Sequence, residues 1–166
     1  MATLTENINY LQPTGFKLVL DRENYPNLEF FAQAVMHPEM MLSPAEMPFR
    51  KIARVAIAGG TIDYGELSIT VILDEDMNAY TEMHDWMRGL VDNNLKGPLD
   101  RDDLTVPTTC DITLSILNSH NNVVKQVRYL EAVPSVLGSV SFESTSAGVE
   151  FLTCQMSFRF SIFELV

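Results

Sequence analysis

The sequence predicts a mainly β, α+β fold with one helix, and three observations support this. Apolar and polar residues alternate from Leu67 to Leu73 with the period of two that is typical of a strand. The period then changes, because the apolar positions between Ala79 and Leu90 recur at helical spacing behind the acidic residues 74–76. From Cys110 onward the chain is rich in strand patterns. A chain of 166 residues can bury a sizeable core, and its simplest organisation is one domain over residues 1–166.

In the N-terminal half, alternation predicts a first strand at Phe16–Leu20, which the turn-rich residues 23–27 end. A second strand is expected at Leu28–Met36 and a third at Lys51–Ile57. Between them, residues 37–49 combine prolines with large apolar residues that show no periodicity. This segment is therefore predicted to be a long, apolar loop.

In the C-terminal half, the helix is expected to run to about Val91, and residues 93–107 should form a second, solvated loop. Strands at Cys110–Ile116 and Val123–Val133, joined by a turn at 118–122, predict a hairpin. Residues 134–146 read as irregular, with 139–143 as an optional short strand. The last element is one long strand, Leu152–Ile162, with a face expected in the core that consists of Leu152, Met156, Phe158 and Phe160.

The charge balance bears on the class of protein. The formal net charge of −11 argues against a protein that grips nucleic acid by its phosphates. The two cysteines form no CxxC motif and occupy apolar strand positions, so Cys110 and Cys154 are predicted to be buried free thiols in a reducing cytoplasm. No segment indicates export or membrane insertion.

The sequence predicts neither catalysis nor a bound cofactor. The acidic residues from Asp74 to Asp85 resemble the ligand spacing of an EF-hand, but Ala79 stands where the loop needs glycine. They are better explained as the acidic start of a helix with Asp74 as its cap. The histidines share no metal-ligand spacing, and no phosphate-binding loop or GxSxG motif is present. We therefore expect no enzyme activity, no metal site and no cofactor.

The apolar loop at 37–49 has two interpretations. It either packs under its own domain or contacts a partner, because such a surface left exposed on a monomer promotes association. The second interpretation is favoured, and the residues predicted to contact a neighbouring subunit are Met40, Met41, Leu42, Met47 and Phe49.

Several segments in a fixed order resemble one protein family. They are the Pro13-Thr14-Gly15-Phe16 start of the first strand, the loop ending in Pro48-Phe49-Arg50, the block Ile57–Trp86, and a closing strand that ends in an aromatic residue and an acid. Their order and spacing resemble the tail tube proteins of phages with contractile tails, which are similar in fold to the tubes of pyocins and to the Hcp proteins of type VI secretion.

The resemblance implies an antiparallel β-sandwich or small barrel with one flanking helix, whose copies close into hexameric rings that stack into the inner tube. It also implies a set of partners: the tail sheath, the tape measure protein, baseplate proteins, and DNA that passes through without specific binding. The expected location is the virion tail, after assembly in the host cytoplasm. Six copies would multiply the acidic charge of one chain and repel phosphate wherever it faces inward.

Two alternatives stay open. A baseplate protein that initiates the tube, or a tail-completion protein, would have the same fold. A monomeric ligand-binding β-sandwich, such as a carbohydrate module, would need aromatic residues exposed on a groove. The single tryptophan, Trp86, lies instead on the apolar stripe of the predicted helix.

Overall fold

The computed structural model describes residues 10–20, 24–49, 53–57, 59–95, 106–144 and 151–166, with the backbone alone for residue 30 and for strands β4 and β5. Along the chain the elements are β1 (Phe16–Val19), α1 (Pro26–Phe30), β2 (Ala32–Met36), β3 (Met40–Leu42), β4 (Ala45–Phe49), β5 (Ala53–Ile57), β6 (Ile62–Tyr64), β7 (Leu67–Ile72), α2 (Asn78–Leu95), β8 (Cys110–Leu117), β9 (Val123–Leu137), β10 (Thr153–Arg159) and β11 (Ile162–Leu165).

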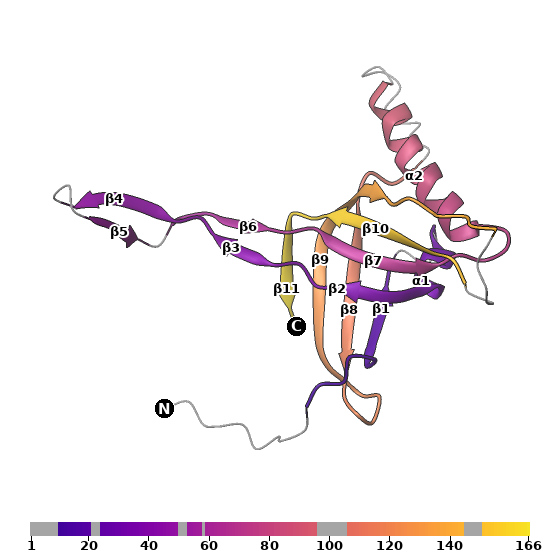
Figure 1. The fold of residues 1–166 in the computed structure, drawn as a ribbon, viewed down its shortest axis with the longest axis horizontal. Coiled ribbons are helices and arrows are strands. Elements are labelled where there is room, and N and C mark those ends of the chain that lie inside the picture. The colour runs from indigo at the N-terminus through magenta and orange to yellow at the C-terminus, as the bar shows by residue number, and fades with distance from the viewer. Residues whose placement is uncertain (1–9, 21–23, 50–52, 58, 96–105, 145–150) are drawn as a thin grey trace.

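The body is one antiparallel sheet that bends into two layers, and the strands of the two layers cross. The strand order is β1-β8-β9-β10-β7-β2, with β11 paired to β9. Strands β2, β7 and β10 run across β8 and β9 and lie in front of them in the view of Figure 1. The predicted antiparallel, mainly β fold with a flanking helix is confirmed.

Strand β9 joins the two layers because it bends at Glu131. The residue has a positive φ of 55°, and the register with β8 shifts between Cys110 and Ile112. Residues before the bend pair with β8 and β11, Ala132 directly after it still pairs with Cys110 of β8, and the residues from Val133 onward pair with β10. Side chains stabilise the bend: Asp111 Oδ1 accepts the Glu131 N–H at 3.2 Å, and Ser161 Oγ donates to Glu131 Oε2 at 2.6 Å. A bulge of this kind allows one strand to serve both layers.

The core lies between the layers and under α2. Alternate residues of β7 and β10 point into it, including Leu67, Ile69, Met156 and Phe158. Trp86 of α2 is fully buried, stacks on Tyr25 with ring centroids 4.5 Å apart, and donates its indole N–H to the Pro107 carbonyl at 2.9 Å. The helix is therefore fixed to the sheet by its apolar stripe, as the sequence predicts.

The start of α2 differs from the prediction in one respect. Met77 has a positive φ of 53°, so the helix begins at Asn78 and the acidic residues 74–76 precede it rather than forming its first turn. Asp74 still acts as a cap, because its Oδ1 accepts the Asn78 N–H at 2.8 Å. Glu82 has a different role, since its carboxylate accepts the N–H groups of Asn27 and Leu28 at the start of α1.

Three expected elements are wrong in the body. The second strand begins at Ala32, because residues 26–30 form α1 with Pro26 in its first turn. Residues 134–137 are part of β9, and no strand forms at 139–143. The closing strand is broken at residues 160–161, and Phe160 is half-buried there. Leu152 lies just before β10 and is 36% exposed, whereas Met156 and Phe158 are core as expected.

The helix runs to Leu95, so residues 93–95 belong to α2 and not to the second predicted loop. Residues 96–105 of that loop lie outside the described residues, which resume at 106. Its described end is packed rather than solvated. Val106 is half-buried, and a Cβ on Gly89 of α2 would come within 2.7 Å of its side chain. Both cysteines are buried free thiols, as predicted.

Candidate assembly interface

A two-stranded arm projects from the body between β2 and β7. Strands β3 and β6 form its base, β4 and β5 form its outer part, and Figure 1 shows it extending away from both sheet layers. At about 3.3 Å per residue, the strand from Met40 to Phe49 spans roughly 30 Å. The predicted loop at 37–49 is therefore wrong as secondary structure, because this segment is extended and hydrogen-bonded to residues 53–64.

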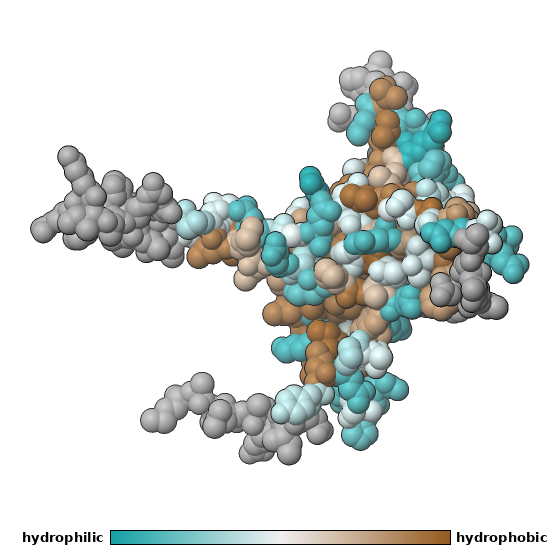
Figure 2. Space-filling view, in the orientation of Figure 1, coloured by the Kyte–Doolittle hydropathy of each residue, from teal (hydrophilic) through white to brown (hydrophobic). Residues whose placement is uncertain are grey.

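The two faces of the arm base differ in chemistry. In the register, Met40 faces Tyr64 and Leu42 faces Ile62, which places these apolar residues on one face. Met41 faces Asp63 on the other face, where Ser43 Oγ donates to Asp63 Oδ2 at 2.8 Å. Met40, Leu42 and Ile62 are 58%, 52% and 46% exposed. One side of the arm base is thus an uncovered apolar strip in the single subunit, and brown patches on the described part of the arm are visible in Figure 2.

An aromatic cluster fixes the arm to the body. Tyr64 is the last residue of β6, where the arm rejoins the body. Its ring packs against Phe160 and Phe163, with ring centroids 5.6 and 5.2 Å away. His37 precedes β3, and its ring is 5.0 Å from that of Phe163 in an edge arrangement. Tyr129 of β9 packs against Phe160 at 5.1 Å. The chain break at 160–161 brings Phe160 and Phe163 into this cluster, so the shape of the C-terminus supports the arm.

His37 and Tyr129 also form a hydrogen bond, with Nδ1 and the hydroxyl oxygen 2.6 Å apart. Burial lowers the pKa of His37 and raises the pKa of Tyr129, so both side chains are held in their neutral forms. The hydrogen bond orients His37, the residue at which the arm leaves the body, and the pair adds no charge at that point.

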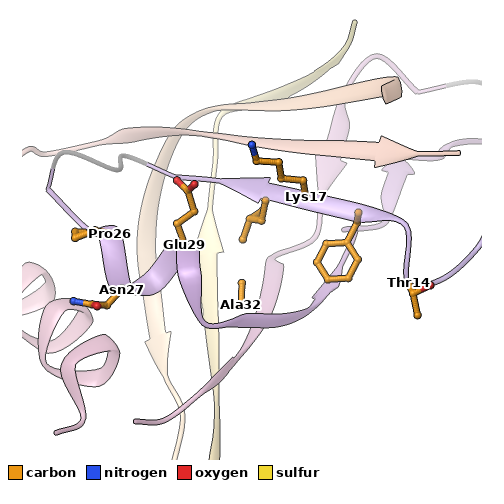
Figure 3. A pocket seen from close by; sticks show the side chains of 8 residues that line it. Thr14, Lys17, Pro26, Asn27, Glu29 and Ala32 are labelled. Carbon is orange, nitrogen blue, oxygen red and sulfur yellow. The ribbon is translucent and has the colours of Figure 1, made fainter. Parts of the chain in front are cut away.

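The sheet is open between its two end strands. Strands β1 and β2 each pair on one side only among the described residues. Between them and α1 lies an open pocket of about 650 Å³ lined by Thr14, Phe16, Lys17, Leu18, Pro26, Asn27, Glu29 and Ala32, which Figure 3 shows from close by. Unpaired strand edges of this kind are suited to pairing with another chain.

Among the described residues, no group of three or more His, Cys, Asp and Glu side chains lies together as metal ligands would. Asp74 caps α2, as described above, and His84 and His120 lie exposed on α2 and in the β8–β9 turn. In the same part of the chain, no helix is long and apolar enough to cross a membrane.

Comparisons with known proteins agree with the mainly β fold and with the predicted family resemblance. No protein-family model matches the chain. The tail tube terminator protein of Enterobacteria phage T4 is 26% identical over 167 residues, covering 98% of this chain and 92% of that protein. The fold matches the tube-terminating cap of the anti-feeding prophage with a TM-score of 0.68, 17% identity, and 98% and 95% of the two chains covered. It also matches a chain of the PVC sheath–tube complex in the extended state, with a TM-score of 0.68, 15% identity, and 96% and 93% covered. The predicted resemblance to the contractile-tail tube proteins is confirmed.

Within this tube-type fold, the predicted contact residues fall on the arm. Met40, Met41 and Leu42 form β3 and are all exposed, while Met47 and Phe49 lie in β4, of whose side chains the structure gives no description. Sequence reasoning missed Ile62, which completes the apolar strip opposite Leu42. The signal that could have found it is the alternation of Ile62 and Tyr64 with the polar Thr61 and Asp63. The register of the outer arm could not, because it would pair Leu42 with Gly60, two residues away from the observed partner.

Proposed function

We propose that this protein is a structural subunit of a contractile phage tail, forming hexameric rings at the end of the inner tube as its terminator. The observation that carries the proposal is the sequence match to the phage T4 tail tube terminator, which extends over nearly the whole of both chains. The fold match to the tube-terminating cap of the anti-feeding prophage is consistent with it.

The geometry gives a physical route to ring formation. The edges of β1 and β2 are open, and in a closed ring each edge would meet a neighbour, which removes the cost of unsatisfied backbone groups. The arm is long enough to reach past the subunit that carries it, and its apolar strip would be covered by an adjacent subunit or ring. Of the residues predicted from the sequence, Met40 and Leu42 are proposed to make this contact together with Ile62, and Met47 and Phe49 of β4 are proposed to extend it. Met41 lies on the opposite face beside Asp63 and is proposed to lie outside the contact.

A second candidate is the repeating subunit of the tube itself. The fold match to the PVC sheath–tube complex favours it to the same degree as the match to the cap. The two functions differ in one measurable property. A repeating subunit presents complementary surfaces at both ends of its ring and polymerises, whereas a terminator ring stops growth at one end.

The proposed partners follow from this position in the tail. They are further copies of the chain, the sheath, the tape measure protein and baseplate proteins, with DNA passing through without specific binding. The exposed acidic residues near and on α2, including Glu75, Asp85 and Asp92, lie outside the sheet layers and would face the sheath. The protein would work in the virion tail after assembly in the host cytoplasm, and no catalytic activity is proposed.

Electron microscopy of the purified protein, together with its mass in solution, tests the proposal. Single rings that do not grow into tubes at high concentration support the terminator. Long tubes support the repeating subunit. A protein that stays monomeric at every concentration and with crowding agents overturns both, and would favour the ligand-binding β-sandwich.

A further inference from the structure

The sheet layer formed by β2, β7, β10 and the end of β9 has an outer face of unusual composition. Its inner residues, such as Ile69 and Met156, are core, so the alternate residues point outward. Although charged residues make up 20% of the chain, these strands contain a single one, Arg159. Apart from Arg159 the outward residues are uncharged. Ala34, Ser68, Thr70 and Gln155 are small or polar, and Met36 and Val136 are apolar and exposed. Figure 2 shows this surface as a mosaic of pale, teal and brown patches over β7 and β10.

Arg159 is balanced by an acid from a neighbouring strand. Its Nε lies 2.9 Å from Oε1 of Glu66, the residue just before β7. Ser135 of β9 donates its hydroxyl to the second carboxylate oxygen of Glu66 at 3.2 Å. The Arg159 side chain is 77% exposed, so without Glu66 a guanidinium would stand free on this face. Glu66 therefore cancels the only positive charge that these strands carry.

A second polar pair lies on the same face. Gln155 Nε2 donates to Ser68 Oγ at 2.7 Å across β10 and β7. Phosphate oxygens are acceptors only and bind where cations and free N–H or O–H donors are presented. With its single cation balanced and this amide engaged, the face offers a phosphate backbone little to hold.

The opposite layer is different. Its strands carry more charge, because Lys17, Lys125 and Arg128 are exposed on them beside the acids Asp111, Glu131 and Glu164, and Arg128 faces Glu164 in the β9–β11 register. If a nucleic acid has to slide past one layer of this subunit, the layer around Gln155 is the one that would let it move.

We infer that the outer face of β2, β7, β10 and the end of β9 is the surface that nucleic acid passes, and that Glu66 keeps this surface non-adhesive by neutralising Arg159. The inference rests on the proposed ring and refines it in one respect. On this face, the lack of binding comes from local neutrality and paired donors, while the excess of acid on the chain lies elsewhere, much of it around α2.

The first test concerns the position of the face. Because Cys110 and Cys154 are buried, a cysteine introduced at an exposed site can be labelled selectively with a maleimide gold particle. In end-on micrographs of rings, gold on Gln155→Cys is expected at the centre, and gold on the control Glu75→Cys, beside α2, at the rim. Gold on Gln155→Cys at the rim overturns the inference while leaving the ring intact.

The second test concerns Glu66 and needs no assembly. Binding of a fluorescent DNA duplex to the full-length protein is measured by anisotropy at low salt. Glu66→Gln should bind at least about tenfold more tightly than the wild type, with affinity that falls steeply as salt rises. The control Glu75→Gln changes the net charge equally and should bind as the wild type does, and adding Arg159→Gln to Glu66→Gln should abolish the gain.

Equal binding by Glu66→Gln and Glu75→Gln would overturn the role of Glu66. Binding that survives the removal of Arg159 would overturn the role of that cation. Circular dichroism of each variant verifies that the fold is retained, which is expected because the Glu66 side chain is 36% exposed and glutamine keeps its shape. If no rings form, the proposed function fails, and the DNA measurement still decides whether Glu66 neutralises this face.

Discussion

Replacing Leu42 and Ile62 together with serine should prevent assembly without unfolding the subunit. These residues face each other across β3 and β6, on the apolar side of the arm. Both are about half exposed, at 52% and 46%. Their side chains contribute nothing to the described core, so the melting temperature of the isolated subunit should change little.

The magnitude follows from the exposed area. Together the two residues expose roughly 190 Å², and at about 25 cal/mol per Å² its complete burial would contribute about 5 kcal/mol to each contact. Burial of half that area still gives about 2.5 kcal/mol, which weakens association roughly sixtyfold. Sedimentation velocity over a concentration series measures this shift directly.

The arm itself supplies the matched control. Met41 is 57% exposed but lies on the opposite face beside Asp63, so Met41→Ser removes a similar apolar area from the other side. It should assemble at a concentration much closer to that of the wild type. The assignment of the contact to this strip would be refuted if the double variant assembled like the wild type. It would also be refuted if Met41→Ser weakened assembly as much as the double variant does.

Three further predictions concern the subunit alone. Phe158→Asp should abolish soluble expression, because Phe158 is 1% exposed and burial of an unpaired charge costs several kcal/mol; a soluble variant with native circular dichroism would contradict this. Glu82→Gln should lower stability by about 1–2 kcal/mol in urea unfolding, since the charged acceptor of two N–H groups at the start of α1 is lost, whereas the control Asp92→Asn should be neutral. A chelator should leave the melting temperature unchanged, because Asp74 is a helix cap; a stoichiometric ion in elemental analysis would show that this site is misread.

The strand and helix patterns of the body could be predicted because burial on one face imposes a period on the sequence. Residues 67–73 and the stripe on α2 are examples, and both lie in the core where the pattern places them. The bend at Glu131 could not be predicted in this way. A glutamate with positive φ has no sequence signal, and it is stabilised by Asp111 and Ser161 from distant parts of the chain.

The break in the closing strand also depends on contacts with residues that are distant in the sequence. Alternation continues from residue 152 to residue 162, so one uninterrupted strand is the natural prediction. The structure instead separates β10 from β11 at Ser161, whose N–H bonds to the Leu130 carbonyl. Period alone cannot show that two halves of one pattern pair with different parts of β9.

The arm was missed as a pair of strands for a reason that also bears on its function. Pro38, Pro44 and Pro48 argue against a strand inside a sheet, where each proline would remove a ladder hydrogen bond. In a two-stranded ribbon, however, every second N–H points away from the partner strand, so a proline at such a position costs no bond. The described core contains no residue of β3 or β6, so the apolar residues there follow no core-facing period. A segment that is extended, tolerant of proline and apolar without local burial is what a contact to another subunit requires. The features that obscure its secondary structure are therefore the ones that favour docking.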